Sequence, residues 1–279
     1  MIISKFGGSA TASRVALENV KVLSQDKNRR ILVFSAVGKE SETDTKTTDL
    51  LINYSLKNAN RELIEKEIMH KFERLKQNLH VGFDVYAEWR EVFNRYIFTN
   101  DRNFLISRGE FITSKILAKA LRIKLVPADK IFYFKDQKID FEKTRTATLA
   151  YLKIYRQILV PGFYGADEKG DIVLLSRGGS DVSAAVFAKV LGADVYENWT
   201  DVNGIYLRDP HVQKSKQIEK MNYSKLLHLS ENGAKVIHKD CAKLLIWKQV
   251  SLKVCSIFNP QSPPTIISDN LNPEKERGL

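Results

Sequence analysis

The fold of this chain is decided by the stretch Leu174-Leu175-Ser176-Arg177-Gly178-Gly179-Ser180-Asp181. An apolar run at 172–175 stops at two glycines, and a small, apolar helical pattern begins directly after them. This change of period indicates a strand that turns into a helix at the glycines. Paired glycines let a backbone approach a ligand, and the free N–H groups of a first helical turn attract anions, with Ser180 at the N-cap or first helical position.

Two charged side chains flank this junction. Arg177 can hold a carboxylate or a phosphate with two parallel hydrogen bonds, and Asp181 can orient a cation or hold another side chain. The same residues would also suit a plain tight turn with a solvated ion pair between Arg177 and Asp181. The stretch alone therefore leaves an anion site and a structural turn both open.

A second buried strand is predicted at 193–199, after that helix. It ends in Thr200 and Asp201, and a glycine turn and an exposed Tyr206 follow. We expect this strand and the one at 172–175 to be neighbours that release their polar residues at the same edge. Open α/β sheets bind their ligands at such an edge, so the pattern favours a ligand site.

The N-terminus repeats the order of strand, glycine pair and helix. Residues 2–6 predict a strand, Gly7-Gly8-Ser9 closes it, and an apolar helical pattern follows. Lys5 can reach a bound phosphate as a point charge, although a lysine at a strand end is often only a surface residue. The P-loop and protein-kinase signatures do not occur in the sequence.

A polar segment separates the next strand, predicted at 31–34, from a long helical region. Residues 39–48 have no hydrophobic pattern, so they form either a substrate loop or a plain linker, capped into a helix by Thr48 or Asp49. The helical pattern at 49–121 has breaks at 79–84 and 99–103. Its aromatic residues are assigned to the core and to helix contacts: Phe72, Phe83, Tyr86, Trp89, Phe93, Tyr96 and Phe98.

Gly109 and Glu110 lie inside the last of these helices. A glycine within a helix costs about 1 kcal/mol relative to alanine, so we expect a ligand or another backbone to approach there. The Glu110 carboxylate could receive an ammonium group. The remaining elements are expected as a strand at 124–127, a hairpin at 131–141, helices at 144–154, 223–231 and 234–248, strands at 251–257 and 265–268, and a frayed tail at 270–279.

Composition points to one large α/β domain of 279 residues, with 43% hydrophobic and 28% charged residues. Because no apolar run reaches the roughly 18 residues of a membrane span and no signal-peptide layout is present, we expect no membrane association and a cytoplasmic location. The two cysteines, Cys241 and Cys255, are expected to be reduced and structural.

The net charge of +11 raises the question of nucleic-acid binding. The basic residues are interleaved with glutamates on helical segments, which is typical of a solvated helix face. They include Lys57, Arg61, Lys66, Lys71, Arg74 and Lys76. We therefore expect no nucleic-acid partner, and the charge suits small anionic ligands.

With these pieces in place, an ordered set of motifs resembles the aspartate kinase family. The motifs are Lys5-Phe6-Gly7-Gly8-Ser9, Ser35-Ala36, Asp44-Thr45-Lys46, Thr48-Asp49-Leu50-Leu51, Ser107 with Gly109-Glu110, Pro161-Gly162-Phe163, Arg177-Gly178-Gly179-Ser180-Asp181, Trp199-Thr200-Asp201, Gly204-Ile205-Tyr206, Asp209-Pro210 and Gly233-Ala234-Lys235-Val236 with His238. The resemblance implies the amino-acid kinase fold, an α/β fold in which a parallel-rich open sheet is sandwiched between helices in three αβα layers.

The resemblance also implies an activity, in which ATP and Mg²⁺ phosphorylate the β-carboxylate of L-aspartate to give 4-phospho-L-aspartate. In the family this is the first step toward lysine, threonine, methionine and isoleucine. Residues 1–268 would form the catalytic domain, with the aspartate-binding part mainly at 35–165, the nucleotide-binding part mainly at 170–268, and a tail at 269–279. The resemblance is compatible with a homodimer.

The same resemblance assigns a role to each site residue. Lys5 and the amides of Gly7, Gly8 and Ser9 would hold the transferring phosphoryl group, and Asp181 would hold Lys5 in place. Arg177 would bind the α-carboxylate of aspartate, and Glu110 its ammonium group. The rest of the aspartate pocket would be formed by Ser35, Thr48, Phe163 and Ser180. The nucleotide site would be lined by Thr200, Asp201, Tyr206, His211, Lys235 and Val236.

Some features depart from the family pattern. Ala10 stands where a hydroxyl residue is usual, and His211 stands where an arginine near the phosphates is common. Aspartate kinases usually continue into ACT domains that bind lysine or threonine, and this sequence ends before them, so we expect a catalytic unit without feedback regulation of its own. Two other interpretations stay open: an enzyme of this fold that acts on another small carboxylate, and a non-catalytic aspartokinase-like binding subunit.

Overall fold

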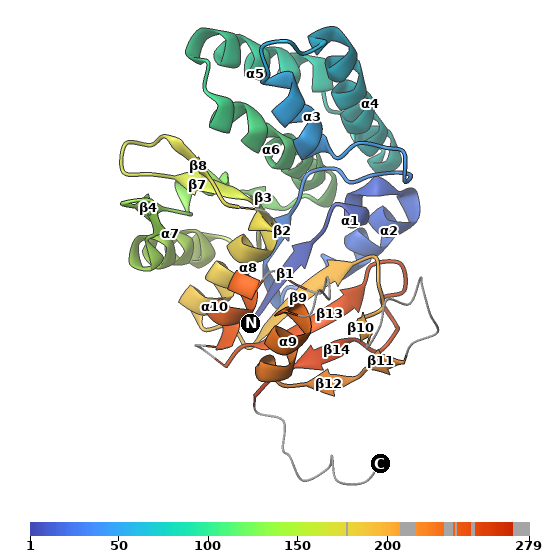
Figure 1. Ribbon diagram of the computed structural model, residues 1–279, viewed down its shortest axis with the longest axis vertical. Helices are drawn as coiled ribbons and strands as arrows, with labels where there is room; N and C mark the ends of the chain where they lie inside the picture. Colours follow the sequence, from blue (N-terminus) through green and yellow to red (C-terminus); the bar gives the residue numbers. More distant parts are fainter. Residues whose placement is uncertain (177, 207–215, 232–236, 238, 247–248, 270–279) are drawn as a thin grey trace.

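The computed structural model describes residues 1–176, 178–206, 216–231, 237, 239–246 and 249–269 (Figure 1). Within these residues, the centre is an eight-stranded sheet in the order β12-β14-β13-β9-β1-β2-β6-β3. Its strands are β1 (Ile2–Phe6), β2 (Arg29–Phe34), β3 (Lys124–Leu125), β6 (Ile158–Pro161), β9 (Val195–Thr200), β12 (Lys220–Met221), β13 (Ser251–Ser256) and β14 (Thr265–Ile267). Neighbours pair in parallel except β13 and β14, so the prediction of a parallel-rich sheet is confirmed.

The chain crosses the sheet in two directions from β1. It first moves outward past β2, and it then returns through α8 (Gly179–Leu191) to β9, on the other side of β1. Right-handed crossovers of opposite direction place their helices on opposite faces. Accordingly, α1 (Ser9–Ala12), α2 (Arg14–Leu23) and α6 (Arg102–Leu121) cover one face, and α7 (Phe141–Ile154), α8 and α10 (Lys239–Ile246) cover the other. The predicted three layers are confirmed.

Four helices build the part of the molecule at the top of Figure 1, namely α3 (Thr47–Tyr54), α4 (Arg61–Leu79), α5 (Val85–Thr99) and α6. Asn60, Asp84 and Asp101 cap the last three by accepting a hydrogen bond from a first-turn N–H group. The breaks predicted at 79–84 and 99–103 are confirmed. A further break at 55–60 was not predicted, because the apolar pattern runs on through it.

The aromatic residues of this helical region divide between the core and the surface. Phe72, Trp89 and Tyr96 are buried, as predicted. Tyr86 is 62% exposed and Phe98 is 92% exposed, so the core assignment is wrong for these two. Tyr86 lies in the first turn of α5 and Phe98 in its last turn, where the other helices leave both side chains exposed.

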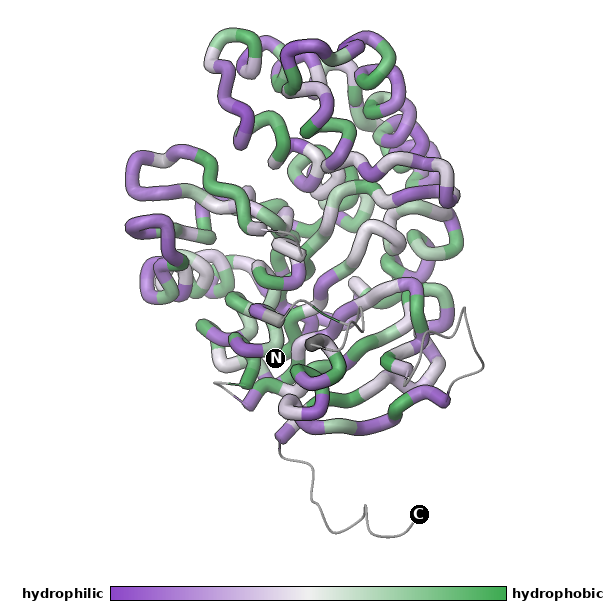
Figure 2. The backbone as a smooth tube through the Cα atoms, viewed as in Figure 1, coloured by the Kyte–Doolittle hydropathy of each residue, from purple (hydrophilic) through white to green (hydrophobic). Residues whose placement is uncertain are grey.

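The apolar run at 172–175 forms a strand, but not in the central sheet. β8 (Ile172–Leu174) pairs antiparallel with β7 (Tyr164–Ala166) in a separate hairpin, whose turn is hydrophilic in Figure 2. The neighbours of β9 are β1 and β13, so the expectation that β8 and β9 lie side by side is wrong. A local apolar pattern predicts a strand without specifying its partner.

The other predicted elements are present with shifted ends. The hairpin at 131–141 is β4 (Phe134–Lys135) with β5 (Lys138–Ile139), after a short 3₁₀ turn, η1 (Ala128–Lys130). α7 begins earlier than residue 144 because Asp140 caps it, accepting a hydrogen bond from Lys143 N over 2.9 Å. Closer to the C-terminus lie β10 (Ile205–Tyr206), which pairs with β11 (Gln217–Ile218), and α9 (Tyr223–Glu231).

Two expectations concern burial and membranes. Cys241 and Cys255 are buried and free, and burial raises the pKa of the Cys255 thiol to about 12, so both suit the structural role expected of them. Across the part of the chain that the structure describes, no helix combines the length and apolar character that a membrane crossing requires.

Candidate active site

Four parallel strands of the sheet end at one edge. The register places Phe6 level with Phe34 and Trp199, and Phe34 level with Pro161. Backbone hydrogen bonds continue past these positions, from Gly7 N to Trp199 O at 3.1 Å and from Gly162 N to Phe34 O at 2.9 Å. The edge lies where the chain reverses between β1 and β9, which is where open α/β sheets bind ligands.

Lys5 is the charged group at the centre of this edge. It is 9% exposed, and its Nζ lies 2.7 Å from Asp181 Oδ1 and 3.4 Å from Asn198 Oδ1. The predicted approach of Lys5 and Asp181 is therefore present. Asn198 was not predicted, because only the register of β1 against β9 shows that it faces Lys5.

The glycine loop after β1 is packed against the segment after β2. Gly38 N donates to Gly8 O over 3.1 Å, and a β-carbon on Gly38 would lie 2.3 Å from Gly8 O. A β-carbon on Gly7 would lie 3.3 Å from Lys5 Nζ. Gly8 is needed for this close approach, since a β-carbon there would lie 2.9 Å from Gly38 Cα, and Ser9 begins α1 directly after it. Ala10, which replaces the usual hydroxyl, is fully buried.

The N-terminus of α8 differs from the prediction in one detail. Gly178 is the N-cap, in the left-handed region at φ 76°, and Gly179 is the first helical residue. Ser180 is therefore the second residue of the helix, and its assignment to the N-cap or first position is wrong. Glycine takes the cap because it adopts a positive φ without strain. Asp181 follows in the first turn, where it reaches Lys5.

The segment 161–163 packs on this helical turn. A β-carbon on Gly162 would lie 2.7 Å from Ser180 Cβ, and one on Gly179 would lie 2.6 Å from a ring carbon of Phe163. The backbone N–H of Phe163 donates a hydrogen bond to Ser183 Oγ over 3.0 Å. Phe163 and Ser180, predicted together from separate motifs, are neighbours in the structure.

Glu110 is a buried carboxylate that faces the same edge. It is 4% exposed on α6, and burial raises its pKa to about 8, against hydrogen bonds from backbone amides, among them Ala36, and from the Thr48 side chain. Its Oε2 is buried without a hydrogen-bond partner among the described residues. Ala36 links this carboxylate to the glycine loop, since a β-carbon on Gly8 would lie 3.3 Å from Ala36 O.

The glycine before Glu110 is closely approached by side chains, whereas the sequence predicted a ligand or another backbone there. A β-carbon on Gly109 would lie 3.1 Å from a methyl carbon of Leu51 and 3.2 Å from Ala36 Cβ. Ser35 begins the segment that supplies Ala36, and its N–H donates to Phe6 O over 3.0 Å. Thr48 and Glu110 therefore lie beside the segment that Ser35 begins.

The residues predicted for the nucleotide lie after β9. Thr200 ends this strand, and its hydroxyl donates to Asp201 Oδ1 over 3.0 Å. Tyr206 is half-buried in β10, level with Gln217. Four further predicted site residues lie outside the described residues: Arg177, His211, Lys235 and Val236.

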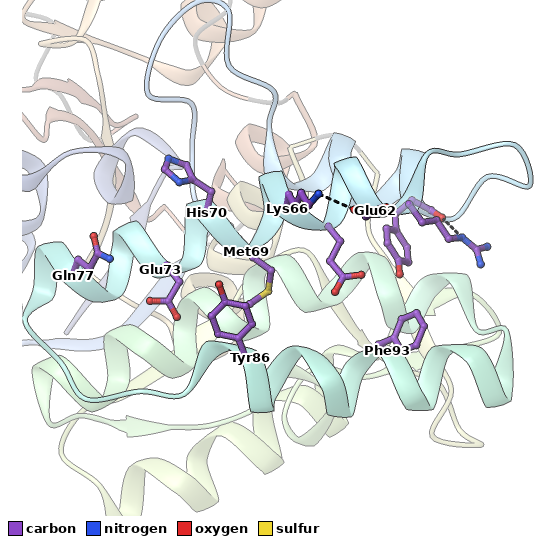
Figure 3. A pocket seen from close by; sticks show the side chains of 11 residues that line it. Glu62, Lys66, Met69, His70, Glu73, Gln77, Tyr86 and Phe93 are labelled. Atoms are coloured by element: carbon purple, nitrogen blue, oxygen red, sulfur yellow. Dashed lines mark hydrogen bonds and ion pairs between the residues drawn. The ribbon is translucent and has the colours of Figure 1, made fainter.

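A hollow of about 800 Å³ lies between α4 and α5, away from this edge (Figure 3). Met69, Tyr86 and Phe93 form its apolar wall, and Glu62 and Glu73 lie along α4. None of the predicted site residues lines it. Within the described part of the chain, no group of three or more His, Cys, Asp or Glu side chains is arranged to hold a metal ion.

This fold is that of a known protein family. The chain belongs to the amino acid kinase family, whose model matches residues 1–256. Among curated proteins, it is similar to aspartokinase 3 of Bacillus subtilis, at 29% identity over 297 residues, and to the lysine-sensitive aspartokinase 3 of Escherichia coli, at 27% identity over 306 residues. These matches cover 98% and 100% of this chain and 65% and 67% of the relatives.

Solved structures of aspartate kinases have the same fold as this chain. The aspartate kinase of Clostridium acetobutylicum superimposes with a TM-score of 0.89 at 30% identity, over 98% of this chain and 64% of that one. Aspartokinase III of E. coli, solved with aspartate and ADP, has the same fold, with a TM-score of 0.86 at 23% identity over 98% of this chain and 65% of that one. The chain thus spans about two thirds of the length of the relatives it matches.

Proposed function

We propose that this chain is the catalytic part of an aspartate kinase, which transfers the γ-phosphoryl group of ATP to the β-carboxylate of L-aspartate. The observation that carries the proposal is the buried Glu110 carboxylate, whose Oε2 has no partner in the described residues and which shares Ala36 with the glycine loop. A buried acceptor of this kind is satisfied by a cationic donor. The α-ammonium of an amino acid supplies one beside the phosphate loop.

The glycine loop and Lys5 supply the chemistry of phosphoryl transfer. This reaction depends on alignment and on neutralising the charge of the transferring group, without a covalent nucleophile. Lys5 contributes a buried positive charge, and the close contact of Gly7 with Lys5 Nζ puts loop amides beside it. Ser9 would extend the row of amides as α1 begins.

Asp181 acts on Lys5 rather than on the substrate. The β-carboxylate of aspartate is already ionised at neutral pH, so no general base is needed to activate it. The 2.7 Å ion pair with Asp181 and the contact with Asn198 fix the lysine from two sides. Both therefore hold the ammonium in one position for the phosphate.

ATP and Mg²⁺ would bind beside β9. Thr200, Asp201 and Tyr206 lie beyond the strand edge next to Lys5, and Asp201 is an exposed carboxylate. Mg²⁺ takes one or two protein carboxylates and fills its remaining positions with phosphates and water, so Asp201 fits the ion. Bound Mg²⁺ supplies charge neutralisation at the phosphates. Arg177 is proposed for the α-carboxylate of aspartate, and His211, Lys235 and Val236 for the nucleotide, from the sequence motifs alone.

The test is a panel of acceptors with MgATP, in which hydroxylamine traps any acyl phosphate. L-Aspartate is expected to give product, whereas succinate, which lacks the ammonium group, is expected to give little because Glu110 would stay unpaired. Product from succinate or glutamate in preference to aspartate would support another acceptor. Binding of ATP by calorimetry without any transfer would support a binding subunit instead.

A further inference from the structure

Lys71 is a buried charge on a helix whose lysines were expected to face solvent. The residue lies on α4 and is 2% exposed, so the expectation of a solvated face is wrong for it. Its Nζ lies 2.7 and 2.6 Å from the two carboxylate oxygens of Asp44. Lys66, on the same helix, pairs instead with Glu62 in solvent, with side chains 71% and 81% exposed. Burying a charged pair costs solvation free energy, so its position needs an explanation.

The partner of Lys71 organises the segment 38–44. Asp44 Oδ2 accepts a hydrogen bond from Glu40 N over 2.8 Å, and Lys71 Nζ also lies 3.5 Å from Gly38 O. Burial raises the pKa of Asp44, but the hydrogen bonds from Lys71 and from the Glu40 amide outweigh it and bring the pKa below its usual range. One turn further along α4, Arg74 forms an ion pair with Glu40. Lys71 therefore holds both ends of this segment, and Arg74 its middle.

The segment held in this way touches the glycine loop. Gly38 N donates to Gly8 O over 3.1 Å, and a β-carbon on Gly8 would lie 2.9 Å from Gly38 Cα. The two backbones are in direct contact, so a displacement of Gly38 displaces Gly8. A continuous set of contacts thus joins Lys71 to the loop beside Lys5.

We infer that Lys71 is a positioning residue for phosphoryl transfer: its ion pair with Asp44 fixes Gly38 against Gly8 and so sets the geometry of the glycine loop. The inference rests on the proposed function, because it gives that loop the role of holding the phosphoryl group. It also gives a structural role to Asp44, which belongs to one of the motifs quoted above and touches none of the predicted site residues in the contacts described.

The test compares Lys71→Met, the double variant Lys71→Met/Asp44→Asn, and the control Lys66→Met. Melting temperature, kcat and KM for MgATP, and amide hydrogen exchange at 5–12 and 36–46 are measured for each. Lys71→Met is expected to lower kcat/KM for MgATP by about tenfold or more, because small misplacements of catalytic groups have effects of this size. Exchange is expected to accelerate by about tenfold in both segments. Lys66→Met should match the wild type.

The double variant separates positioning from simple stabilisation. Removing both charges relieves the unpaired Asp44, so the melting temperature should return toward that of the wild type. If Lys71 positions the glycine loop, kcat/KM for MgATP stays low in the double variant and amide exchange at 5–12 stays fast. Recovery of activity and protection together with stability would overturn the inference, as would unchanged exchange at 5–12 in Lys71→Met.

Hydrogen exchange also separates this inference from the proposed function. If the wild-type protein phosphorylates no acceptor, the proposed function fails, but the exchange at 5–12 still reports whether Lys71 controls the glycine loop. If the wild type is active and the exchange at 5–12 does not respond to Lys71→Met, the proposed function stands and the positioning role fails.

Discussion

Lys5 is a buried positive charge at the centre of the candidate site. Asp181 holds the Lys5 ammonium group in place through an ion pair of 2.7 Å. Substitution of Lys5 removes the positive charge from the site, whereas substitution of Asp181 removes only the group that orients it. We expect Lys5→Met to lower kcat by about 10³-fold, the size of effect seen when a group that stabilises transition-state charge is lost. Asp181→Asn should lower kcat by about tenfold, since the lysine stays charged. Hydroxylamine trapping measures both.

A lysine in solvated surroundings is the control for Lys5. Lys21 on α2 pairs with Glu18 over 2.8 Å, and the two side chains are 30% and 54% exposed. Lys21→Met should leave kcat unchanged, because exposed ion pairs contribute little. Equal losses in Lys5→Met and Lys21→Met would contradict the role of Lys5.

The ionisation of the Glu110 carboxyl group is expected to make the binding of aspartate depend on pH. With a pKa of about 8, its carboxyl group is protonated at pH 6 and 7 in the empty site, and an ammonium ligand requires it ionised. Binding should therefore release a proton, and the apparent affinity should rise about tenfold per unit between pH 6 and 7, then level off above pH 8. Titration calorimetry in buffers of different ionisation enthalpy measures both quantities.

The matched variant for this titration is Glu110→Gln, which keeps the shape and removes the ionisable group. Its affinity for aspartate should be weaker at pH 8 and should no longer change between pH 6 and 8. A wild-type affinity that is flat over this range would show that Glu110 does not bind the ammonium group.

At the scale of elements, the site depends on backbones that approach more closely than side chains allow. A β-carbon on Gly38 would lie 2.3 Å from the backbone of Gly8, so Gly38→Ala must push the two segments apart. We expect a loss of about 1–3 kcal/mol in the free energy of unfolding, together with weaker ATP binding. Gly82→Ala, where nothing lies within 4 Å, should change stability by less than about 0.5 kcal/mol. Urea unfolding and calorimetry measure these effects.

The strands at the centre of the sheet are joined by a buried polar cluster. Glu197 on β9 is 5% exposed and accepts hydrogen bonds from Arg29 Nε at 2.8 Å, Ser4 Oγ at 2.8 Å and Trp199 Nε1 at 3.0 Å. Ser4 and Glu197 are level in the parallel register, one residue before Lys5 and Asn198. Side chains alternate along a strand, so this cluster lies on the face opposite Lys5.

A substitution in this cluster is therefore expected to lower the stability of the protein without changing its catalytic rate. Glu197→Gln removes one of the two carboxylates that pair with the largely buried Arg29, the other being Asp26, and should cost about 1–3 kcal/mol of unfolding free energy. Steady-state kinetics below the unfolding transition should stay within about twofold of the wild type, because the catalytic face is unchanged. The exposed pair of Glu18 and Lys21 serves as the control, with little loss expected for Glu18→Gln.

For the whole molecule, local patterns in the sequence predicted elements well and their neighbours less well. The run at 172–175 is a strand, but its partner is β7 rather than β9, since pairing depends on the whole topology. Lys71 lies among charged residues that resemble a solvated face, and only the approach of Asp44 and Gly38 explains its burial. Lys5 and Asp181 were predicted from ordered motifs, whereas Asn198 requires the strand register.

The sheet also bears on how the two proposed binding parts unfold. β2 and β6 belong to the part at 35–165 or border it, β9 and β13 belong to the part at 170–268, and β1 pairs with both β2 and β9. Because one continuous sheet and one core run through both parts, we expect a single cooperative unfolding transition. MgATP at about 100 times its Kd should shift that whole transition upward by about 5 °C.

Tryptophan fluorescence can follow the two parts separately. The sequence has three tryptophans, Trp89 on α5, Trp199 on β9 and Trp247. Variants that keep Trp89 alone or Trp199 alone report from the aspartate side or the nucleotide side. In each variant, the fluorescence transition should coincide with its own calorimetric transition, and MgATP should move both together. Two separate transitions, with MgATP shifting only the one seen by Trp199, would mean that the parts fold as independent domains and that the central sheet does not couple them.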